Sequence, residues 1–247
     1  MLRREAGFQP QNITKTRMKK RTLLSWSSGK DSAWALYELR QSPEFEVVGL
    51  VTTVNQAYDR VAMHAVRSDL LRCQADAVGL PLHVLPIPYP CSNAQYEAIM
   101  DGFVAEIRAQ GVECMAFGDL YLEGIRRYRE DRLKDTGIAP VFPLWQKPTD
   151  QLIEQMFAEG LRAWISCVDP KHLAPEFAGR RLDRALLDEL PDTVDPCGEN
   201  GEFHTFAVDG PMFRRPVDVH VGEIVEREGF VFADLIPETS AGDGQEY

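Results

Sequence analysis

The feature that most constrains the fold is a regular alternation of short apolar runs with amphipathic segments up to about residue 170. The apolar runs have the length of buried strands, and the segments between them have the apolar spacing of helices. The predicted strands are 22–26, 45–53, 82–86, 113–117, 138–142 and 163–168, and the predicted helices are 32–40, 64–78, 94–109, 124–134 and 150–159. This alternation predicts an α/β fold, a doubly wound and mostly parallel sheet with right-handed crossovers.

The composition of the sequence changes near Pro191, and Pro, Gly and Asp are frequent from there to residue 201. Farther on, PVDVHVGEIVERE and FVFADL alternate apolar with polar residues on either side of Gly229, which predicts a hairpin. We therefore expect a smaller C-terminal α+β lobe. The predicted parts are a flexible basic arm (1–21), a first domain (22–170), the lobe (171–236) and a disordered tail (237–247).

Composition and charge narrow the class of protein. The 247 residues are 44% hydrophobic, enough for a full core, and 27 Lys and Arg against 38 Asp and Glu give a net charge of −11. This charge disfavours general nucleic-acid binding. No apolar run approaches the ~18 residues of a membrane span, and the N-terminus lacks the apolar centre of a signal peptide, so we expect a cytoplasmic protein without membrane contact. A homo-oligomer is compatible with the sequence, which does not decide it.

The turn after the first predicted strand has the composition of a phosphate-binding loop. It reads SSGKDS and consists of Ser27, Ser28, Gly29, Lys30, Asp31 and Ser32. Small residues let backbone N–H groups converge on an anion at the start of a helix, and Lys30 adds a full positive charge. Asp31 is also suited to help hold Mg²⁺ on the phosphates. The loop is not a Walker A motif, because Asp31 stands where that motif needs a hydroxyl. The alternative is a polar turn that only caps the helix.

SSGKDS resembles the SGGKDS pyrophosphate loop of the N-type ATP pyrophosphatases, which split ATP between its α and β phosphates to adenylate an acceptor. A second block, CGENGEFHTF at 197–206 followed by DGP, resembles the CGEGGE(F/Y)ET signature of the diphthine–ammonia ligase family. Segments at 63–64, 74–82, 118–145 and 179–183 fit as well. The resemblance covers roughly residues 21–215, and the GENGEFHT variant is similar to bacterial-type members.

The resemblance implies a Rossmann-like, adenine nucleotide alpha hydrolase-like fold and an AMP-forming amide ligase. ATP would adenylate a carboxylate, and ammonia or ammonium would then displace AMP. In archaeal and eukaryotic relatives the carboxylate belongs to diphthine. Asn200 and His204 stand where the archaeal signature has Gly and Glu. The acceptor therefore stays open between a small molecule and a protein side chain.

The signature block supplies further candidate catalytic residues. Gly198 and Gly201 allow tight bends that bring short polar groups to a common centre. Glu199 and Glu202 are candidates for binding ammonium, orienting the acceptor or removing a proton, and His204, titrating near neutrality, is an additional candidate base. The alternative is a loop whose carboxylates merely cap backbone donors.

Three further site residues follow from position. Asp119 comes just after a predicted strand, at the sheet edge that carries the phosphate loop, so we expect it to be catalytic together with Lys30. We expect adenine recognition by main-chain groups around Thr52, at the end of the second predicted strand. His64, on the loop and helix that follow, is a candidate for a nucleotide or acceptor contact, and the alternative is a solvated helix surface. The cofactors are then ATP and Mg²⁺, the 22–170 domain binds ATP, and the C-terminal lobe binds the acceptor.

Two other functions stay open. A transfer-RNA-modifying ATP pyrophosphatase would need a catalytic cysteine pair or a strongly basic surface, and the sequence displays neither. A non-catalytic regulator that binds adenine nucleotide would leave ATP intact.

Overall fold

The structure, a computed structural model, describes residues 18–56, 60–61 and 66–238. Its first sheet contains the parallel strands β1 (Lys20–Ser25), β2 (Phe45–Asn55), β4 (Leu82–Ile87), β5 (Cys114–Ala116) and β6 (Ala139–Val141). Strand β1 lies between β2 and β5, β4 pairs with β2, and β6 pairs with β5. A short strand, β3 (Arg60–Val61), runs antiparallel to the end of β2. The predicted, mostly parallel α/β sheet is confirmed.

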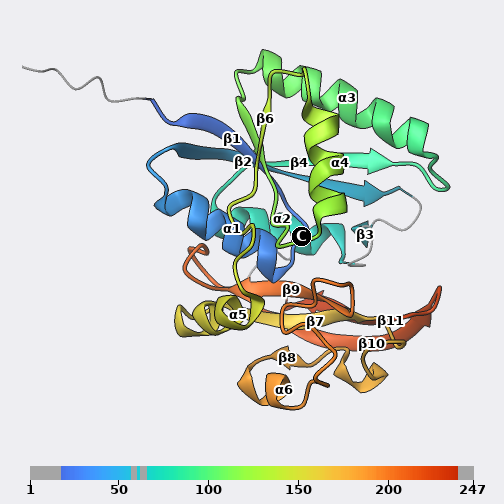
Figure 1. Cartoon of the computed structure of the whole chain (residues 1–247). Coiled ribbons are helices and arrows are strands. Elements are labelled where there is room, and N and C mark those ends of the chain that lie inside the picture. Colours follow the sequence, from blue (N-terminus) through green and yellow to red (C-terminus); the bar gives the residue numbers. More distant parts are fainter. Residues whose placement is uncertain (1–17, 57–59, 62–65, 239–247) are drawn as a thin grey trace, which may run out of the picture.

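Helices cover both faces of this sheet (Figure 1). They are α1 (Lys30–Gln41), α2 (Ser68–Val78), α3 (Asn93–Ala109) and α4 (Glu123–Leu133). Two successive residues of β1 illustrate the two faces, since alternate side chains of a strand point in opposite directions. Leu24 packs in the core cluster that contains α1 and α2, whereas Leu23 packs with residues of α3 and α4. The sheet is therefore doubly wound, as predicted.

The second, smaller sheet is antiparallel. It contains β7 (Arg162–Val168), β8 (Arg181–Leu182), β9 (Phe203–Asp209), β10 (Val219–Arg227) and β11 (Phe230–Pro237), and it is accompanied by α5 (Thr149–Ala158), the 3-10 turn η1 (Pro175–Phe177) and α6 (Arg184–Asp188). Strands β10 and β11 form the predicted hairpin around Gly229. The predicted C-terminal α+β lobe is confirmed.

One predicted strand belongs to a different sheet from the one expected. Residues 163–168 follow the sequence pattern of a sixth strand of the first domain, but β7 pairs antiparallel with β9, β8 and β11. Its buried residues continue the large core cluster. A strand buried on both faces has the same apolar pattern in a parallel sheet and in the middle of this one, so periodicity could not separate the two cases.

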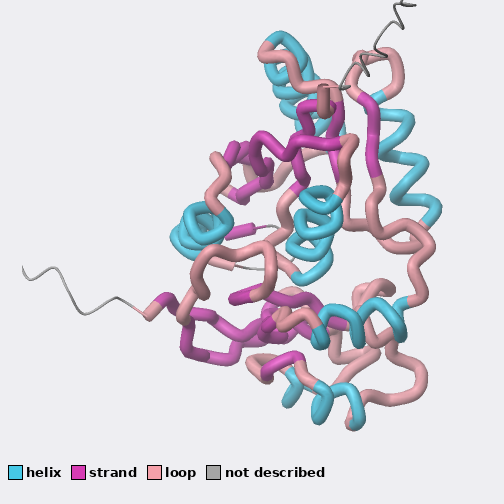
Figure 2. Tube along the Cα trace, turned by 90° about the vertical axis from the view of Figure 1, so that its left-hand side faces the viewer, coloured by secondary structure: helices cyan, strands magenta, loops and turns pink. Residues whose placement is uncertain are grey.

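The two sheets enclose one continuous core, with α1 and α2 between them (Figures 1 and 2). Polar contacts join the sheets at the turn after β1. The backbone N–H of Ala207, in β9, donates to the Ser28 carbonyl at 2.9 Å. The buried Gln74 of α2 donates to the same carbonyl at 3.0 Å and accepts from the Trp26 indole at 2.8 Å. The SSGKDS turn therefore lies at the junction of the two sheets.

The two ends of the chain fall partly outside the described residues. Lys20 and Arg21, assigned to the basic arm on sequence grounds, form the start of β1. Residues 1–17 and 239–247, which contain the rest of the arm and most of the predicted tail, lie outside the described ranges. None of the helices in the described ranges combines the length and the apolar character that crossing a membrane requires.

Candidate functional site

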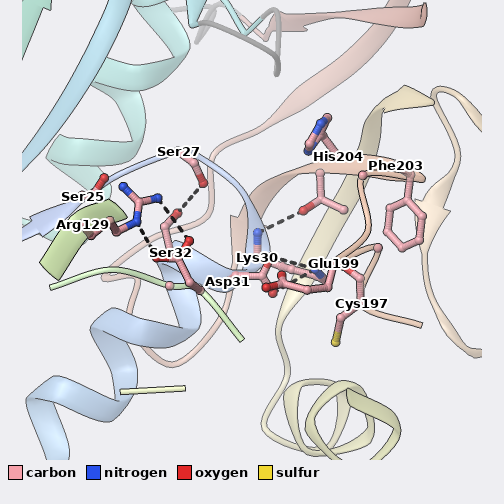
Figure 3. A pocket seen from close by; sticks show the side chains of 15 residues that line it. Ser25, Ser27, Lys30, Asp31, Ser32, Arg129, Cys197, Glu199, Phe203 and His204 are labelled. Carbon is pink, nitrogen blue, oxygen red and sulfur yellow. Dashed lines mark hydrogen bonds and ion pairs between the residues drawn. The ribbon is translucent and has the colours of Figure 1, made fainter. Parts of the chain in front are cut away.

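A cavity of about 230 Å³ lies where the SSGKDS turn, the segment after β5, α4 and the 197–205 segment meet (Figure 3). The predicted site residues that line it are Ser27, Lys30, Asp31, Ser32, Asp119, Glu199 and His204. Three other predicted residues, Ser28, Gly29 and Glu202, lie beside the cavity without lining it. Residues almost 180 positions apart in the sequence thus contribute to one polar site.

The turn itself is shaped by contacts with the second sheet. Ser28 adopts φ 72°, in the left-handed region, and this turns its carbonyl toward Ala207. Gly29 then provides the N-cap of α1, and the backbone N–H of Lys30 donates to the Thr205 hydroxyl at 3.0 Å. A small, tightly bent loop of this kind leaves its backbone open to a ligand.

Lys30 lines the cavity, with 2% of its surface exposed. Its ammonium donates to both carboxylate oxygens of Asp31, at 2.9 and 2.8 Å, and to the carbonyl of Cys197. Burial acts to lower the pKa of Lys30, but the neighbouring negative charge, above all that of Asp31, raises it above the usual value. The side chain is therefore a fixed positive charge inside the site.

Glu199 is a carboxylic acid whose ionisation falls near neutral pH. Burial raises its pKa to about 7, against the stabilising N–H groups of Leu120 at 2.9 Å and Tyr121 at 3.4 Å. A group with this pKa can both accept and release a proton near pH 7. The arrangement suits Glu199 to general base or acid catalysis.

His204 differs from the sequence-based expectation of titration near neutrality. Burial, with the charge of Lys30 as a second cause, lowers its pKa to about 4. The imidazole is therefore uncharged at pH 7, and it lines the cavity as a neutral polar group. Sequence could not reveal this shift, because it depends on the packing of β9 against the first sheet.

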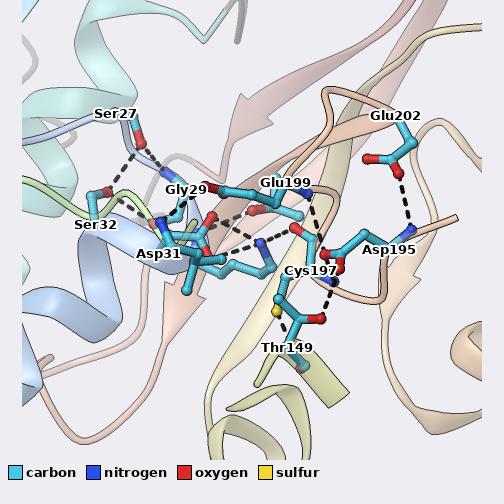
Figure 4. A network of polar contacts seen from close by, with 12 residues as sticks. Ser27, Gly29, Asp31, Ser32, Thr149, Asp195, Cys197, Glu199 and Glu202 are labelled. Atoms are coloured by element: carbon cyan, nitrogen blue, oxygen red, sulfur yellow. Dashed lines mark hydrogen bonds and ion pairs between the residues drawn. The ribbon is translucent and has the colours of Figure 1, made fainter. Parts of the chain in front are cut away.

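Glu202 is buried, and the hydrogen bonds of its side chain stay within its own loop (Figure 4). It accepts from the backbone N–H groups of Asp195 and Asn200 and from the Asn200 amide, each at 3.0 Å. Burial would raise the pKa of Glu202, but these hydrogen bonds hold it below its usual value. The predicted catalytic role of Glu202 stays a prediction, and its contacts are those of the alternative, a carboxylate that caps backbone donors.

The side chain of Asp195 also accepts hydrogen bonds within this loop. It accepts from the N–H groups of Cys197 at 2.8 Å and Glu199 at 3.3 Å, and from the Thr149 hydroxyl at 2.7 Å. The loop thus holds the Cys197 carbonyl against Lys30 and the Glu199 side chain in the cavity. Sequence reasoning did not select Asp195, although its place two residues before the signature block was an available signal.

Asp119 lines the cavity in an ion pair with Arg129 of α4, a residue that sequence reasoning missed. The Nε and Nη2 atoms of Arg129 donate to the two oxygens of Asp119, at 2.6 and 3.1 Å. The guanidinium also lies over the Phe117 ring, 4.3 Å from its centre. In the sequence Arg129 is one of several charges on a polar helix, so no local signal separates it from its neighbours.

A second pocket, of about 440 Å³, adjoins the first. Thr52 and Thr53 at the end of β2 line it, together with apolar side chains that include Met100 and Ile125. The predicted residue Thr52 is therefore next to the polar cavity, whereas His64 lies outside the described residues. A polar cavity that continues into a largely apolar pocket fits a ligand with an anionic end and a flat, less polar end.

The described residues contain no group of three or more His, Cys, Asp or Glu side chains arranged to hold a metal ion. Asp31, the predicted Mg²⁺ ligand, has both carboxylate oxygens bonded to Lys30. Its role as a metal ligand stays a prediction that requires a bound phosphate group to supply further oxygen ligands.

Comparison with known proteins gives consistent results for both parts of the chain. Residues 18–140 match the diphthamide synthase N-terminal domain, and residues 148–235 match the diphthamide synthase C-terminal domain. The chain is 31% identical over 234 residues to diphthine–ammonia ligase of Danio rerio, covering 85% of this chain and 90% of that protein. It is 28% and 27% identical over 237 residues to the Bos taurus and Homo sapiens diphthine–ammonia ligases, covering 85% of this chain and 86% of each relative.

Proposed function

The chain belongs to the diphthamide synthase family, and from this premise we propose that it is an ATP-dependent ligase that adenylates a carboxylate and converts it to an amide with ammonia. The products of the reaction are the amide, AMP and pyrophosphate. The observation that carries the proposal is the continuity of the two pockets, one polar with the buried ammonium of Lys30 and one largely apolar at the end of β2. Together they suit the phosphates and the nucleoside of ATP.

ATP is placed with adenosine in the pocket beside Thr52 and with its outer phosphates at Lys30. Ligands of open α/β sheets bind beyond the carboxyl ends of the strands where the strand order reverses, and β1 lies at that reversal. The serine hydroxyls of Ser27 and Ser32, which line the cavity, are additional donors to phosphate oxygens. The positive end of α1 favours the same charge.

In the first step, an oxygen of the acceptor carboxylate attacks the α-phosphorus. The bond from the α-phosphorus to the oxygen bridging the α and β phosphates breaks, and its electron pair leaves with pyrophosphate. Lys30 stabilises the negative charge that accumulates on this leaving group, because a fixed charge in a low-dielectric site needs no reorganisation. The product is an acyl adenylate.

In the second step, the nitrogen of ammonia attacks the acyl carbon, and the bond to the AMP oxygen breaks. The nitrogen loses a proton as the amide forms, and Glu199 is the group proposed to accept it. Its pKa of about 7 leaves a substantial fraction ionised at neutral pH while keeping it basic enough for the transfer. His204, neutral at pH 7, is proposed to orient the acceptor rather than to act as the principal base.

Magnesium is proposed to bind chiefly through the phosphates of ATP, with Asp31 as a protein ligand. Carboxylate and phosphate oxygens are the ligands that Mg²⁺ prefers. The ion would neutralise phosphate charge when bound. We also propose a cytoplasmic location, where ATP and ammonium are both available.

The acceptor is proposed to be a carboxylate on a small molecule or on a protein side chain. Diphthine is the substrate that the relatives' names specify, and it is one member of this class. A sulfur-inserting reaction is disfavoured, because burial raises the pKa of the Cys197 thiol, which lines the cavity, to about 12. A thiol in this state is a poor nucleophile.

The test is to incubate the protein with ATP labelled at the α phosphate, ammonium and fractionated small molecules and proteins of a cell extract. Label should appear in AMP, in amounts that match the amide formed. Lys30→Ala should abolish this turnover, while Lys171→Ala, which removes an exposed lysine outside the cavity, should not. ATP that stays intact with every fraction would instead favour a nucleotide-binding regulator.

A further inference from the structure

The two pockets of the site share a small set of lining residues, which defines a junction between them. These are Ser25, Ser27, Asp119, Arg129 and His204. If adenosine lies in the apolar pocket and the outer phosphates lie at Lys30, as proposed above, the α-phosphate is the group that links them and must pass through this junction. The residues of the junction are therefore the ones that face the reacting phosphorus.

Arg129 is the cation of this junction. Figure 3 shows Arg129 on one side of the cavity and Lys30 farther across it, toward Glu199 and Cys197, with Ser27 and Ser32 between the two cations. The side chain of Arg129 is 29% exposed, and the residue lines both pockets. Lys30 is held away from Arg129 by Asp31 and the Cys197 carbonyl. The two cations thus face different parts of an extended ligand.

The guanidinium is held in place but retains donors for a ligand. Two of its nitrogen atoms, Nε and Nη2, donate to Asp119, and the Phe117 ring supports its face. An arginine carries five N–H bonds, so this ion pair leaves others for an anion. Guanidinium is suited to phosphate because its planar donors match two phosphate oxygens.

The other arginines of α4 with described contacts are directed elsewhere. Arg126 pairs with Glu130 and lies over Trp145, and Arg132 pairs with Asp101 and Glu97. Neither lines either of the two joined pockets. Within the described part of α4, Arg129 is therefore the arginine that reaches the junction.

We propose that Arg129 binds the α-phosphate of ATP and stabilises the charge that develops there during attack by the carboxylate, with Asp119 as the positioning residue that orients it. The attacking group and the phosphoryl group are both anionic, so a cation beside the phosphorus reduces their repulsion as well as the charge of the transition state. This proposal rests on the proposed use of ATP.

The experiment compares the affinities of AMP, inorganic pyrophosphate and an ATP analogue with a methylene group between the α and β phosphates, measured by calorimetry. Arg129→Ala should weaken AMP and the analogue by roughly tenfold or more, since a charge-assisted contact contributes about 1.5–3 kcal/mol, and should leave pyrophosphate within about twofold. Lys30→Ala should show the reverse preference. Arg132→Ala, a matched change one turn farther along α4, should alter none of the three.

Two further variants guard against a purely structural effect. Arg129→Lys keeps a positive charge and should recover part of the AMP affinity. Asp119→Asn leaves the guanidinium in place but less firmly oriented, so it should lower kcat for AMP formation more than it raises KM for ATP. Equal losses of AMP and pyrophosphate binding in Arg129→Ala, or unchanged AMP binding, would overturn the proposal.

The outcomes also separate this inference from the proposed function. Binding is measured without turnover, so an Arg129-dependent AMP affinity in a protein that never cleaves ATP would support α-phosphate binding by Arg129, and would contradict both the ligase and the transition-state role of Arg129. A wild-type protein that forms amide, beside an Arg129→Ala variant with wild-type AMP affinity, would leave the ligase intact and refute the inference.

Discussion

At the scale of single residues, Ser28 combines two unfavourable features. It adopts φ 72°, which a residue with a Cβ atom rarely does, and its buried hydroxyl has no hydrogen-bond partner in the structure. Ser28→Gly should therefore raise the free energy of unfolding by about 1 kcal/mol, after allowing for the greater freedom of glycine in the unfolded chain. Urea or thermal unfolding measures the change.

A matched control for Ser28 is Asp135→Gly. Asp135 has φ 62° but is exposed, so this change relieves backbone strain without removing a buried hydroxyl. Its stabilisation should be smaller than that of Ser28→Gly. A Ser28→Gly protein no more stable than the wild type would show that the turn does not store this strain.

Ionisation of Glu199 should make the rate of amide formation rise with pH and the free energy of unfolding fall with pH. Its pKa is about 7 in the folded protein, against 4.5 for the ordinary group, so the folded state retains the proton between these values. Its contribution to stability is therefore complete below about pH 4.5 and is lost as pH rises through 7. The rate of amide formation should increase through the same value, because the ionised carboxylate is the proposed base.

Glu199→Gln tests both effects, because the amide oxygen can still accept from Leu120. The variant should lose the rise in rate near pH 7, and its stability should gain on the wild type between pH 4.5 and 7. Glu130→Gln, a change at a more exposed residue paired with Arg126, should alter neither profile. A rate that still rises near pH 7 in Glu199→Gln would assign the base to another group.

Site residues could be predicted from the sequence where their role depends on a local motif, and could not where it depends on contacts between distant segments. Lys30 and Glu199 could be selected because the chemistry of their motifs is local. The ion pair of Asp119 with Arg129 could not, because it joins the segment after β5 to α4. The low pKa of His204 was missed for the same reason, since burial between two sheets causes it.

At the scale of elements, the 195–202 loop acts as a support for the cavity. Both oxygens of Glu202 accept N–H groups, so Glu202→Gln would place an amide NH₂ against a donor. We expect the free energy of unfolding to fall by about 1–3 kcal/mol, with amide formation impaired more than ATP binding. Thermal unfolding, nucleotide titration and product analysis measure the three quantities.

Glu189→Gln provides the comparison for Glu202, since Glu189 forms an exposed ion pair with Arg180 outside the cavity. It should leave amide formation unchanged. Loss of amide formation by Glu202→Gln at unchanged stability would instead indicate direct participation in the chemistry.

Most helices and strands could be predicted from the sequence, and the exception is the sheet to which β7 belongs. The strands and helices of the first sheet follow from their periodicity, as does the β10–β11 hairpin. The membership of β7 in the second sheet did not, because its partners β8, β9 and β11 all come later in the chain. Local pattern specifies that a strand is buried, whereas its neighbours are fixed by packing.

At the scale of the whole molecule, Gln74 joins the two sheets. It is fully buried, donates to the carbonyls of Ser28 and Ala207 and accepts from Trp26. Gln74→Leu would leave these groups without that partner and should cost about 3 kcal/mol of unfolding free energy. The substitution should also weaken ATP binding, because the hydrogen bond to the Ser28 carbonyl helps to fix the SSGKDS turn.

Urea unfolding followed by tryptophan fluorescence, with nucleotide titration, checks this prediction. Gln110→Leu, which changes an exposed amide at the end of α3, should have little effect on either measurement. Unchanged ATP affinity in a destabilised Gln74→Leu protein would show that the turn holds its shape without this link.

The hydrogen bonds from Ala207 to Ser28 and from Lys30 to Thr205 also affect how the protein is made. Translation releases the N-terminal segments first, and they begin to fold as they emerge. A nascent chain that has reached only β6 still lacks both of these contacts. Strand β9 must therefore be synthesised before the SSGKDS turn can reach the conformation that it has in the folded protein.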